Sequence, residues 1–195
     1  MIPIAELLAQ RTLDLPAIAH ALDTLDKEAR LRVVMGLGRR QQAALFEAAA
    51  GHRPITLEDL VPPDTPPLVE VVHEGKNSLV AFRRFAKVFC RPDGDLRDEL
   101  WGYNRCRPLI AATVGPGYFI ARAGAPGEVL IDYLRVPPRK PESWPQIVPN
   151  RARLGRFVYD QMQDILRGIS RHVSVGRATK NGRSLDAWFL LCRMQ

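Results

Sequence analysis

The longest regular pattern of apolar positions in the chain lies between residues 150 and 169, at the spacing of one helical stripe. Its members are Leu154, Phe157, Val158, Met162, Ile165, Leu166 and Ile169. Asn150 follows Pro149 and suits the N-cap position, where its side chain can accept from a free backbone N–H. The pattern predicts one long amphipathic helix whose opposite face carries Arg153, Arg156 and Arg167.

A β-hairpin is predicted directly after this helix. Asn181-Gly182 favours a type I′ turn, in which both central residues have positive φ. With those two residues as the loop, the predicted pairs are Lys180 with Arg183, Arg177 with Asp186, Val175 with Trp188 and Val173 with Leu190. One face of the hairpin carries small residues around Gly176, and we expect the long helix to pack there.

The first 64 residues show helical spacing interrupted by capping signals. Asp14 and Asp26 each precede an apolar helical pattern and suit the N-cap position. Five prolines between Pro54 and Pro67 then mark a boundary near Thr65. We therefore expect a helical module with a proline-rich linker over residues 1–64 and a second domain over residues 65–195.

The middle of the chain changes from a mixed pattern to a β pattern. Residues 68–72 have strand composition, whereas Leu79, Phe82, Phe85, Ala86 and Phe89 indicate a helix with an aromatic core stripe. From residue 100, four apolar segments separated by Gly/Pro turns predict strands. These segments are 100–104, 108–114, 118–121 and 128–136.

These patterns predict an α+β fold. The expected architecture is an N-terminal helical module followed by a curved antiparallel sheet of about six strands, packed against the long helix near the C-terminus. Residues 68–72 would supply one further strand.

Composition is consistent with a globular protein that buries a sizeable core, because 46% of its 195 residues are hydrophobic. No apolar run approaches the roughly 18 residues of a membrane span. The first residues lack the basic region of a signal peptide, and the three cysteines are odd in number and widely spaced. We therefore expect a cytoplasmic protein with reduced thiols.

Charge is unevenly distributed along the chain. Residues 1–64 contain 7 Lys/Arg and 9 Asp/Glu, a balance of −2, and residues 65–195 contain 21 and 12, a balance of +9. The candidate basic surface consists of Arg83, Arg84, Lys87, Arg91, Arg153, Arg156 and Arg167. It is compatible with nucleic acid or an acidic protein as a partner, but a solvated basic surface is the more common explanation.

No catalytic or metal-binding motif is present in the sequence. The four histidines are scattered, no HExxH or Cys/His cluster occurs, and no GxSxG nucleophile turn is found. We therefore assign no catalytic residues, no metal site and no cofactor.

The strongest local indication of a site is Asp132, a carboxylate within an apolar β segment, where an unpaired charge is costly. Three environments would stabilise Asp132: it either faces solvent, or pairs with an arginine, or lines a polar pocket. Five further residues are candidates for the same pocket on the basis of neighbouring strands, the hairpin base and the proline-rich segment 136–149. They are Tyr103, Asn104, Tyr133, Trp144 and His172.

The function that these features favour is non-catalytic binding of a small, partly apolar ligand or a partner protein in a pocket between sheet and helix. One alternative is a nucleic-acid or acidic-protein binder that uses basic helix faces, with affinity that falls steeply with salt. The other is an enzyme that uses a carboxylate with a histidine or tyrosine in the same cavity. The sequence does not predict an oligomeric state.

Overall fold

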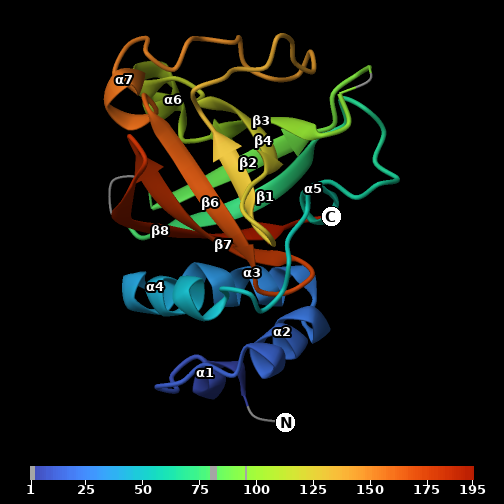
Figure 1. Ribbon diagram of the computed structural model, residues 1–195, viewed down its shortest axis with the longest axis vertical. Coiled ribbons are helices and arrows are strands. Elements are labelled where there is room, and N and C mark those ends of the chain that lie inside the picture. The colour runs from blue at the N-terminus through green and yellow to red at the C-terminus, as the bar shows by residue number, and fades with distance from the viewer. Residues whose placement is uncertain (1–2, 80–82, 95) are drawn as a thin grey trace.

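The computed structural model describes residues 3–79, 83–94 and 96–195, and its centre is a closed barrel of eight antiparallel strands (Figure 1). The strands are β1 (Val71–Asn77), β2 (Arg84–Cys90), β3 (Glu99–Arg105), β4 (Tyr118–Ala123), β5 (Val129–Asp132), β6 (Met162–Gly168), β7 (Val173–Lys180) and β8 (Arg183–Arg193). The helices are α1 (Ile4–Leu7), α2 (Leu15–Thr24), α3 (Lys27–Gly36), α4 (Arg39–Ala48), α5 (Leu57–Leu60), α6 (Pro108–Val114) and α7 (Gly155–Val158).

The barrel is a simple meander in which each strand pairs with the next one along the chain. The last strand, β8, then pairs with β1, with Gly75 opposite Leu191, and this pairing closes the cylinder. Closure leaves no free sheet edge, so the strands' backbone groups find partners within the barrel. The prediction of an α+β fold with an antiparallel sheet is therefore confirmed, but the sheet has eight strands rather than six and closes on itself.

Aromatic side chains fill one part of the barrel interior. Phe89 of β2 meets Phe119 of β4 with ring centroids 5.3 Å apart, and Phe85 of β2 meets Phe189 of β8 at 5.9 Å. Neither pair of strands is adjacent in the sheet, so these contacts cross the interior. Inward and outward residues alternate along each strand, as the pleat requires.

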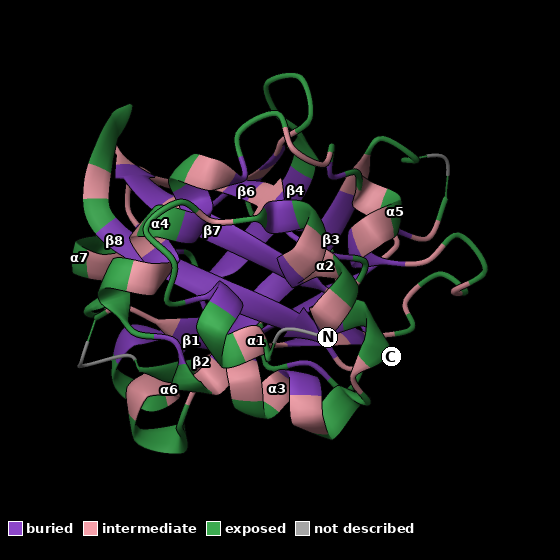
Figure 2. Cartoon of the chain, turned by 90° about the horizontal axis from the view of Figure 1, so that it is seen from below, coloured by how far each residue is buried: buried purple, intermediate pink, exposed green. Residues whose placement is uncertain are grey.

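Helices α3 and α4 lie against the outer face of β7 and β8, and α1 and α2 lie beyond them, farther from the barrel (Figures 1 and 2). Ile18, Val34 and Leu45 form one apolar cluster with Val175 and Leu190, and all five are buried. Burial of this surface holds the helices on the barrel.

The predicted N-caps of this helical region are confirmed. Asp14 accepts from the backbone N–H of Ala17 at 3.0 Å, and Asp26 accepts from that of Ala29 at 2.7 Å. These bonds begin α2 and α3, respectively.

The proline-rich segment 136–149 packs against the outer face of β2, β3 and β4. Its Trp144 is buried, and its ring lies 4.9 Å from that of Tyr103 and 6.2 Å from that of Tyr118. Trp144 also donates to Glu70 at 3.1 Å.

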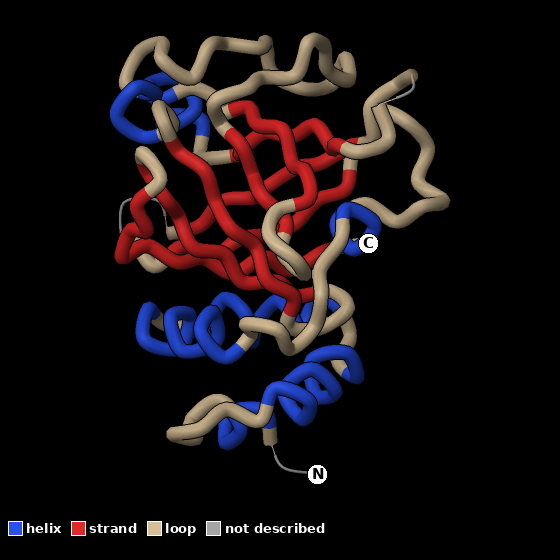
Figure 3. Tube along the Cα trace, in the orientation of Figure 1, coloured by secondary structure: helices blue, strands red, loops and turns tan. Residues whose placement is uncertain are grey.

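The long helix predicted over residues 150–169 is absent, and this part of the fold prediction was wrong. Its region contains the single turn α7 and the strand β6, which Figure 3 shows as a short blue coil followed by a red strand. Positive φ angles of 53° at Arg153 and 58° at Gln161 interrupt the helical conformation. Along β6, successive residues face the interior and the outside alternately. The apparent helical stripe therefore arose because the apolar residues of α7 and those of β6 together match helical spacing.

The hairpin turn at Asn181-Gly182 is confirmed, with Lys180 paired to Arg183. The predicted pairing further from the turn was wrong by two residues, because an irregularity between Arg177 and Thr179 shifts the register. Arg177 pairs with Trp188, Val175 pairs with Leu190 and Val173 pairs with Cys192. A bulge of this kind cannot be read from the turn residues.

The small-residue face of this hairpin lines the barrel interior and receives no helix. A Cβ atom added at Gly176 would lie 2.2 Å from the ring of Phe189 on the neighbouring strand. The expectation that a helix packs there was therefore wrong, and an aromatic ring occupies the space instead.

Three further element predictions need correction. The helix expected around residues 79–89 is strand β2, although Phe82 of that stripe lies outside the described residues. The strand expected at 108–114 is helix α6, whose first residue is Pro108, a favourable first helical position. The strand expected at 68–72 begins only at Val71.

Within the described ranges, no helix is long and apolar enough to cross a membrane.

Candidate functional site

A cavity of about 280 Å³ lies inside the barrel and opens between α7, the end of β1 and the β7–β8 hairpin. Apolar side chains make up most of its wall. They are Leu79, Phe85, Phe157, Val158, Met162, Ala178, Leu185, Ala187 and Phe189. Phe157 and Leu79 at the mouth are 65% and 43% exposed, so the cavity communicates with solvent.

Four polar side chains from four different strands or strand ends meet at one side of this cavity. The Lys87 ammonium on β2 lies 3.0 Å from Oδ2 of Asp164 on β6 and donates to Oδ1 of Asn104 on β3 at 3.1 Å. It also donates to the hydroxyl of Tyr133, which directly follows β5. We call Lys87, Asn104, Tyr133 and Asp164 the interior cluster.

The interior cluster uses nearly all of its hydrogen-bonding capacity internally. The Tyr133 hydroxyl accepts from Lys87 and from Nδ2 of Asn104, and it donates to Oδ2 of Asp164 at 3.2 Å. The second N–H of the Asn104 amide donates to the backbone oxygen of Gly117 at 3.1 Å. Three acceptors around Nζ match the three donors of an ammonium group, so this arrangement selects the protonated form of Lys87.

Aromatic rings surround the Lys87 ammonium. Nζ lies 4.9 Å from the ring centroid of Phe119 and 5.1 Å from that of Phe189, whereas it contacts Tyr133 at its hydroxyl. These distances are within the range in which a ring face attracts a cation. The rings and the Asp164 carboxylate together offset the cost of burying a lysine whose side chain is 2% exposed.

Burial shifts the pKa values within the interior cluster. It lowers the pKa of Lys87, while the Asp164 carboxylate acts in the opposite direction. It also raises the pKa of Tyr133 well above the usual range, and the charge of Asp164 adds to this rise. The Tyr133 hydroxyl therefore keeps its proton at neutral pH and acts as a donor to Asp164.

Tyr159 and Cys106 extend the polar side of the cavity toward its mouth. The Tyr159 ring stacks on Tyr133 with centroids 5.3 Å apart, and burial raises the pKa of its hydroxyl above the usual range. Burial also raises the pKa of the Cys106 thiol. At the rim, Lys180 donates to the backbone oxygen of Phe157 at 3.0 Å.

The structure brings only two of the six predicted ligand-binding residues into the cavity, namely Asn104 and Tyr133. Asp132 faces the outside of the barrel, where it accepts from the backbone N–H of Leu134 and lies 3.7 Å from Arg122. Tyr103 and Trp144 pack against each other on the outer face of the sheet, with their ring planes inclined by 56°. His172 lies beside Arg193, 3.2 Å from its guanidinium, in the turn between β6 and β7.

Of the seven residues of the predicted basic surface, only Arg156 lies on a helix, the single turn α7, because the two long helices expected to carry them are absent. Lys87 is buried inside the barrel. Arg91 donates to the backbone oxygen of Val61 at 2.6 Å, and Arg167 pairs with Glu128 at 2.7 Å. The four other arginines are exposed: Arg83, Arg84, Arg153 and Arg156.

Asp164 was missed as a site residue, and Lys87 was assigned to the basic surface rather than to a pocket. Each interrupts an apolar alternation, Phe85-Lys87-Phe89 on β2 and Met162-Asp164-Leu166 on β6. A charged residue at an inward position of a strand is a signal for a buried polar site. It was concealed because both segments also fit a helical period.

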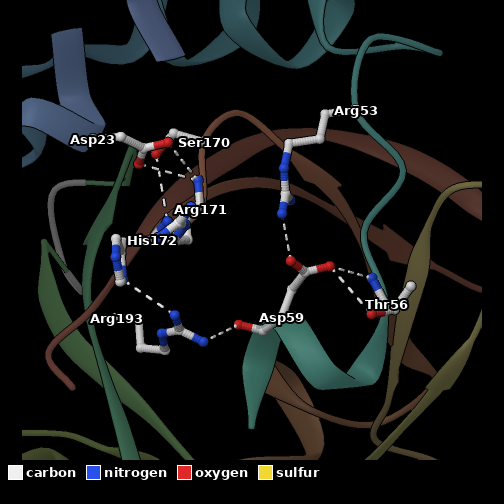
Figure 4. A network of polar contacts seen from close by, with 8 residues as sticks. All are labelled: Asp23, Arg53, Thr56, Asp59, Ser170, Arg171, His172 and Arg193. Atoms are coloured by element: carbon white, nitrogen blue, oxygen red, sulfur yellow. Dashed lines mark hydrogen bonds and ion pairs between the residues drawn. The ribbon is translucent and has the colours of Figure 1, made fainter. Parts of the chain in front are cut away.

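A second polar network lies among α5, β8 and the β6–β7 turn, as Figure 4 shows. Arg193 donates to the backbone oxygen of Asp59 at 2.9 Å, and the Asp59 carboxylate accepts from Arg53 and from the backbone N–H of Thr56. The backbone N–H of Arg171 donates to Asp23 of α2 at 3.1 Å, which ties the turn to the helices. The hollow beside this network measures about 10 Å³, the volume of roughly one water probe, so we assign the network to the fold.

Within residues 3–79, 83–94 and 96–195, no three His, Cys, Asp or Glu side chains are grouped so as to hold a metal ion. No protein-family model, no curated protein and no solved structure matches this chain. The interior cluster and its cavity are therefore the basis for a functional assignment.

Proposed function

We propose that this protein binds one small, partly apolar ligand inside its barrel. The observation that carries the proposal is a cavity of about 280 Å³ that joins an open apolar mouth to a buried polar cluster. An eight-stranded barrel has room for side chains or for one small ligand, and ligand sites typically combine apolar walls with a few placed polar groups. An engineered apolar cavity of about 150 Å³ already binds benzene.

The state of the interior cluster supports holding a ligand over proton-transfer chemistry. Tyr133 keeps its proton because its pKa is raised, and Lys87 is bound to three acceptors. A general acid or base works best with a pKa near the operating pH and an unsatisfied position facing the substrate. The enzymatic alternative would use Asp164 with Tyr133 or Tyr159, because His172 does not line the cavity.

The test uses a substitution that fills the cavity without disrupting the barrel. Ala187 lines the cavity, whereas Ala125 is exposed in the turn between β4 and β5, so Ala187→Phe and Ala125→Phe form a matched pair. We expect wild type to bind one molecule of the neutral dye N-phenyl-1-naphthylamine per chain. Ala187→Phe should weaken that binding at least about tenfold and Ala125→Phe should leave it unchanged, since a buried ring displaces the ligand's volume.

Dye fluorescence measures the binding, and circular dichroism checks that both variants are folded. Equal affinity in all three proteins would place the dye outside the barrel and contradict the proposal. Native mass spectrometry of the freshly purified protein then searches for a bound natural ligand, as a mass that disappears on denaturation.

A further inference from the structure

We infer that the barrel selects an uncharged ligand that carries a hydroxyl group, rather than a carboxylate or an amine. This inference rests on the proposed function and specifies its ligand class. The Lys87 side chain in the cavity first suggests an anionic ligand, but the contacts of Lys87 indicate otherwise.

A ligand carboxylate finds no free donor on Lys87. The ammonium has three N–H groups, and Asp164, Asn104 and Tyr133 already accept them. Burying a carboxylate without hydrogen bonds from the protein is strongly unfavourable. A carboxylate would also approach Asp164, whose charge cancels the attraction of Lys87.

A ligand ammonium is disfavoured by the positive charge of Lys87, the other member of the ion pair. Lys87 occupies the space between the rings of Phe119 and Phe189, where a cation would otherwise be favoured. A second cation beside it would be repelled in a low-dielectric interior. The ion pair therefore makes this side of the cavity electrically neutral overall.

The hydrogen-bonding capacity that the interior cluster leaves free matches a ligand hydroxyl group. Both contacts of Asp164 are made through Oδ2, and no side-chain or backbone donor of the described residues reaches Oδ1. Oδ1 can accept from a ligand O–H. The Tyr159 hydroxyl is already hydrogen-bonded to Asn104 and to the Cys106 thiol, so Oδ1 of Asp164 is the group that a ligand hydroxyl contacts.

One other cation borders the cavity. Lys180 at the mouth is partly exposed and keeps N–H groups beyond the one that it donates to Phe157. A carboxylate ligand would thus bind with its charge at the rim and its tail inward, and its residual affinity would depend on Lys180. A hydroxyl ligand binds in the reverse orientation and does not need Lys180.

The experiment compares three probes that share one tail: 1-octanol, octanoate and octylamine, measured by calorimetry on the full chain at pH 7.5. We expect 1-octanol to bind at least about tenfold more tightly than either charged probe. If octanoate or octylamine binds more tightly than 1-octanol, the ligand class is overturned while the barrel still binds a ligand. If none of the three binds, the proposed function falls and the inference falls with it.

A charge-removing variant tests the physical cause. Asp164→Asn leaves Lys87 without its counter-ion, so octanoate should now bind at least about tenfold better than it binds wild type. Asp132→Asn is the matched control, because Asp132 is an equally buried carboxylate on the outside of the barrel, and it should leave the wild-type order unchanged. An octanoate affinity that stays at the wild-type value in a folded Asp164→Asn variant would overturn the inference. The wild-type comparison decides the ligand class without any variant.

Discussion

Lys87 and Asp164 form an ion pair of 3.0 Å across the barrel interior, although their strands β2 and β6 are not neighbours in the sheet. The side chains are 2% and 6% exposed, so neither charge reaches bulk solvent. A contact of this kind forms only when the barrel has closed. It therefore links the stability of the whole cylinder to the polar side of the cavity.

Removing one member of this pair should be more damaging than removing both. Lys87→Met leaves the Asp164 carboxylate buried and unpaired, and we expect a loss of about 3–5 kcal/mol in the free energy of unfolding. The double variant Lys87→Met/Asp164→Leu leaves no charge in the interior cluster and should recover most of that loss, since apolar replacements of buried ion pairs are often neutral or stabilising. Urea unfolding of wild type, the single variants and the double variant measures the coupling.

The control for this cycle is Arg122→Met, which removes the exposed partner of Asp132. It should cost no more than about 1 kcal/mol, because the Arg122 side chain is 45% exposed, the pair is long at 3.7 Å, and the Asp132 carboxylate keeps the hydrogen bond from the backbone N–H of Leu134. If the losses in the free energy of unfolding of the two single variants add up to the loss of the double variant, the two charges do not interact.

Glycine positions inside the barrel should tolerate no side chain. A Cβ atom at Gly176 would lie 2.2 Å from the ring of Phe189, and one at Gly102 would lie 2.3 Å from the ring of Phe119. Gly176→Ala or Gly102→Ala should each lower the free energy of unfolding by about 1–3 kcal/mol, because these rings cannot move without disturbing the packed interior. Thermal and urea unfolding measure both.

The control is Gly36→Ala in helix α3, where no atom lies within 4 Å of the added Cβ. This substitution should be neutral or stabilising by up to about 1 kcal/mol, since alanine favours helix. A loss at Gly36 as large as that at Gly176 would show that steric contact is not the cause.

The sequence predicts those elements of the fold whose local residue pattern agrees with the burial of their side chains. Asp14 and Asp26 are local capping signals, and Asn181-Gly182 is a local turn signal, and all three predictions are confirmed. The strands β2 and β6 were misread because each carries one charged residue at an inward position. That charge is stabilised by side chains from other parts of the chain, such as Asn104 for Lys87 and Tyr133 for Asp164, and a local pattern does not reveal such partners.

The candidate site was predictable only in part for the same reason. Asn104 and Tyr133 were placed on neighbouring segments and do meet in the cavity. Asp132 attracted attention as a charge in an apolar run, but strand alternation turns it outward and directs Tyr133 inward. Asp132 and Tyr133 are adjacent in the sequence but point to opposite sides of the sheet, so the pocket prediction was wrong for the first and correct for the second.

Occupancy of the cavity should protect Cys106 from alkylation. Cys106 lines the cavity and is partly exposed, whereas Cys90 and Cys192 are fully buried. N-ethylmaleimide should therefore modify one thiol per folded chain, slowly because burial raises the pKa of Cys106. Saturation with whichever octyl probe binds should slow this reaction about tenfold at a concentration ten times its Kd, because only the free protein reacts.

Intact-mass measurement over time follows this alkylation. Cys106→Ser is the control and should show no modification on the same time scale. If the bound probe leaves the rate at Cys106 unchanged, the ligand occupies another part of the molecule.

The last prediction concerns pH and the buried histidine of β1. His73 is 2% exposed, contacts the edge of Phe89 and lies 2.9 Å from the backbone oxygen of Leu60. Burial lowers the pKa of His73 from the model-peptide value of 6.5 to about 4, and the charge of Arg193 acts in the same direction. Between these two values the unfolded chain binds a proton at His73 that the folded protein does not bind.

Stability should therefore fall as pH drops from about 6.5 to about 4, and His73 should contribute about 3 kcal/mol to that fall. His73→Gln keeps a donor for Leu60 but cannot titrate, so its free energy of unfolding should depend less on pH over this window. Urea unfolding at pH 7.5, 6.5, 5.5 and 4.5 measures the slope, and carboxylates common to both proteins cancel in the comparison. His172, whose pKa is also lowered to about 4, serves as the control: His172→Gln removes its own share of the slope and leaves the share of His73. Equal slopes in wild type and His73→Gln would mean that His73 binds protons equally in the folded and unfolded states, which burial beside Phe89 does not allow.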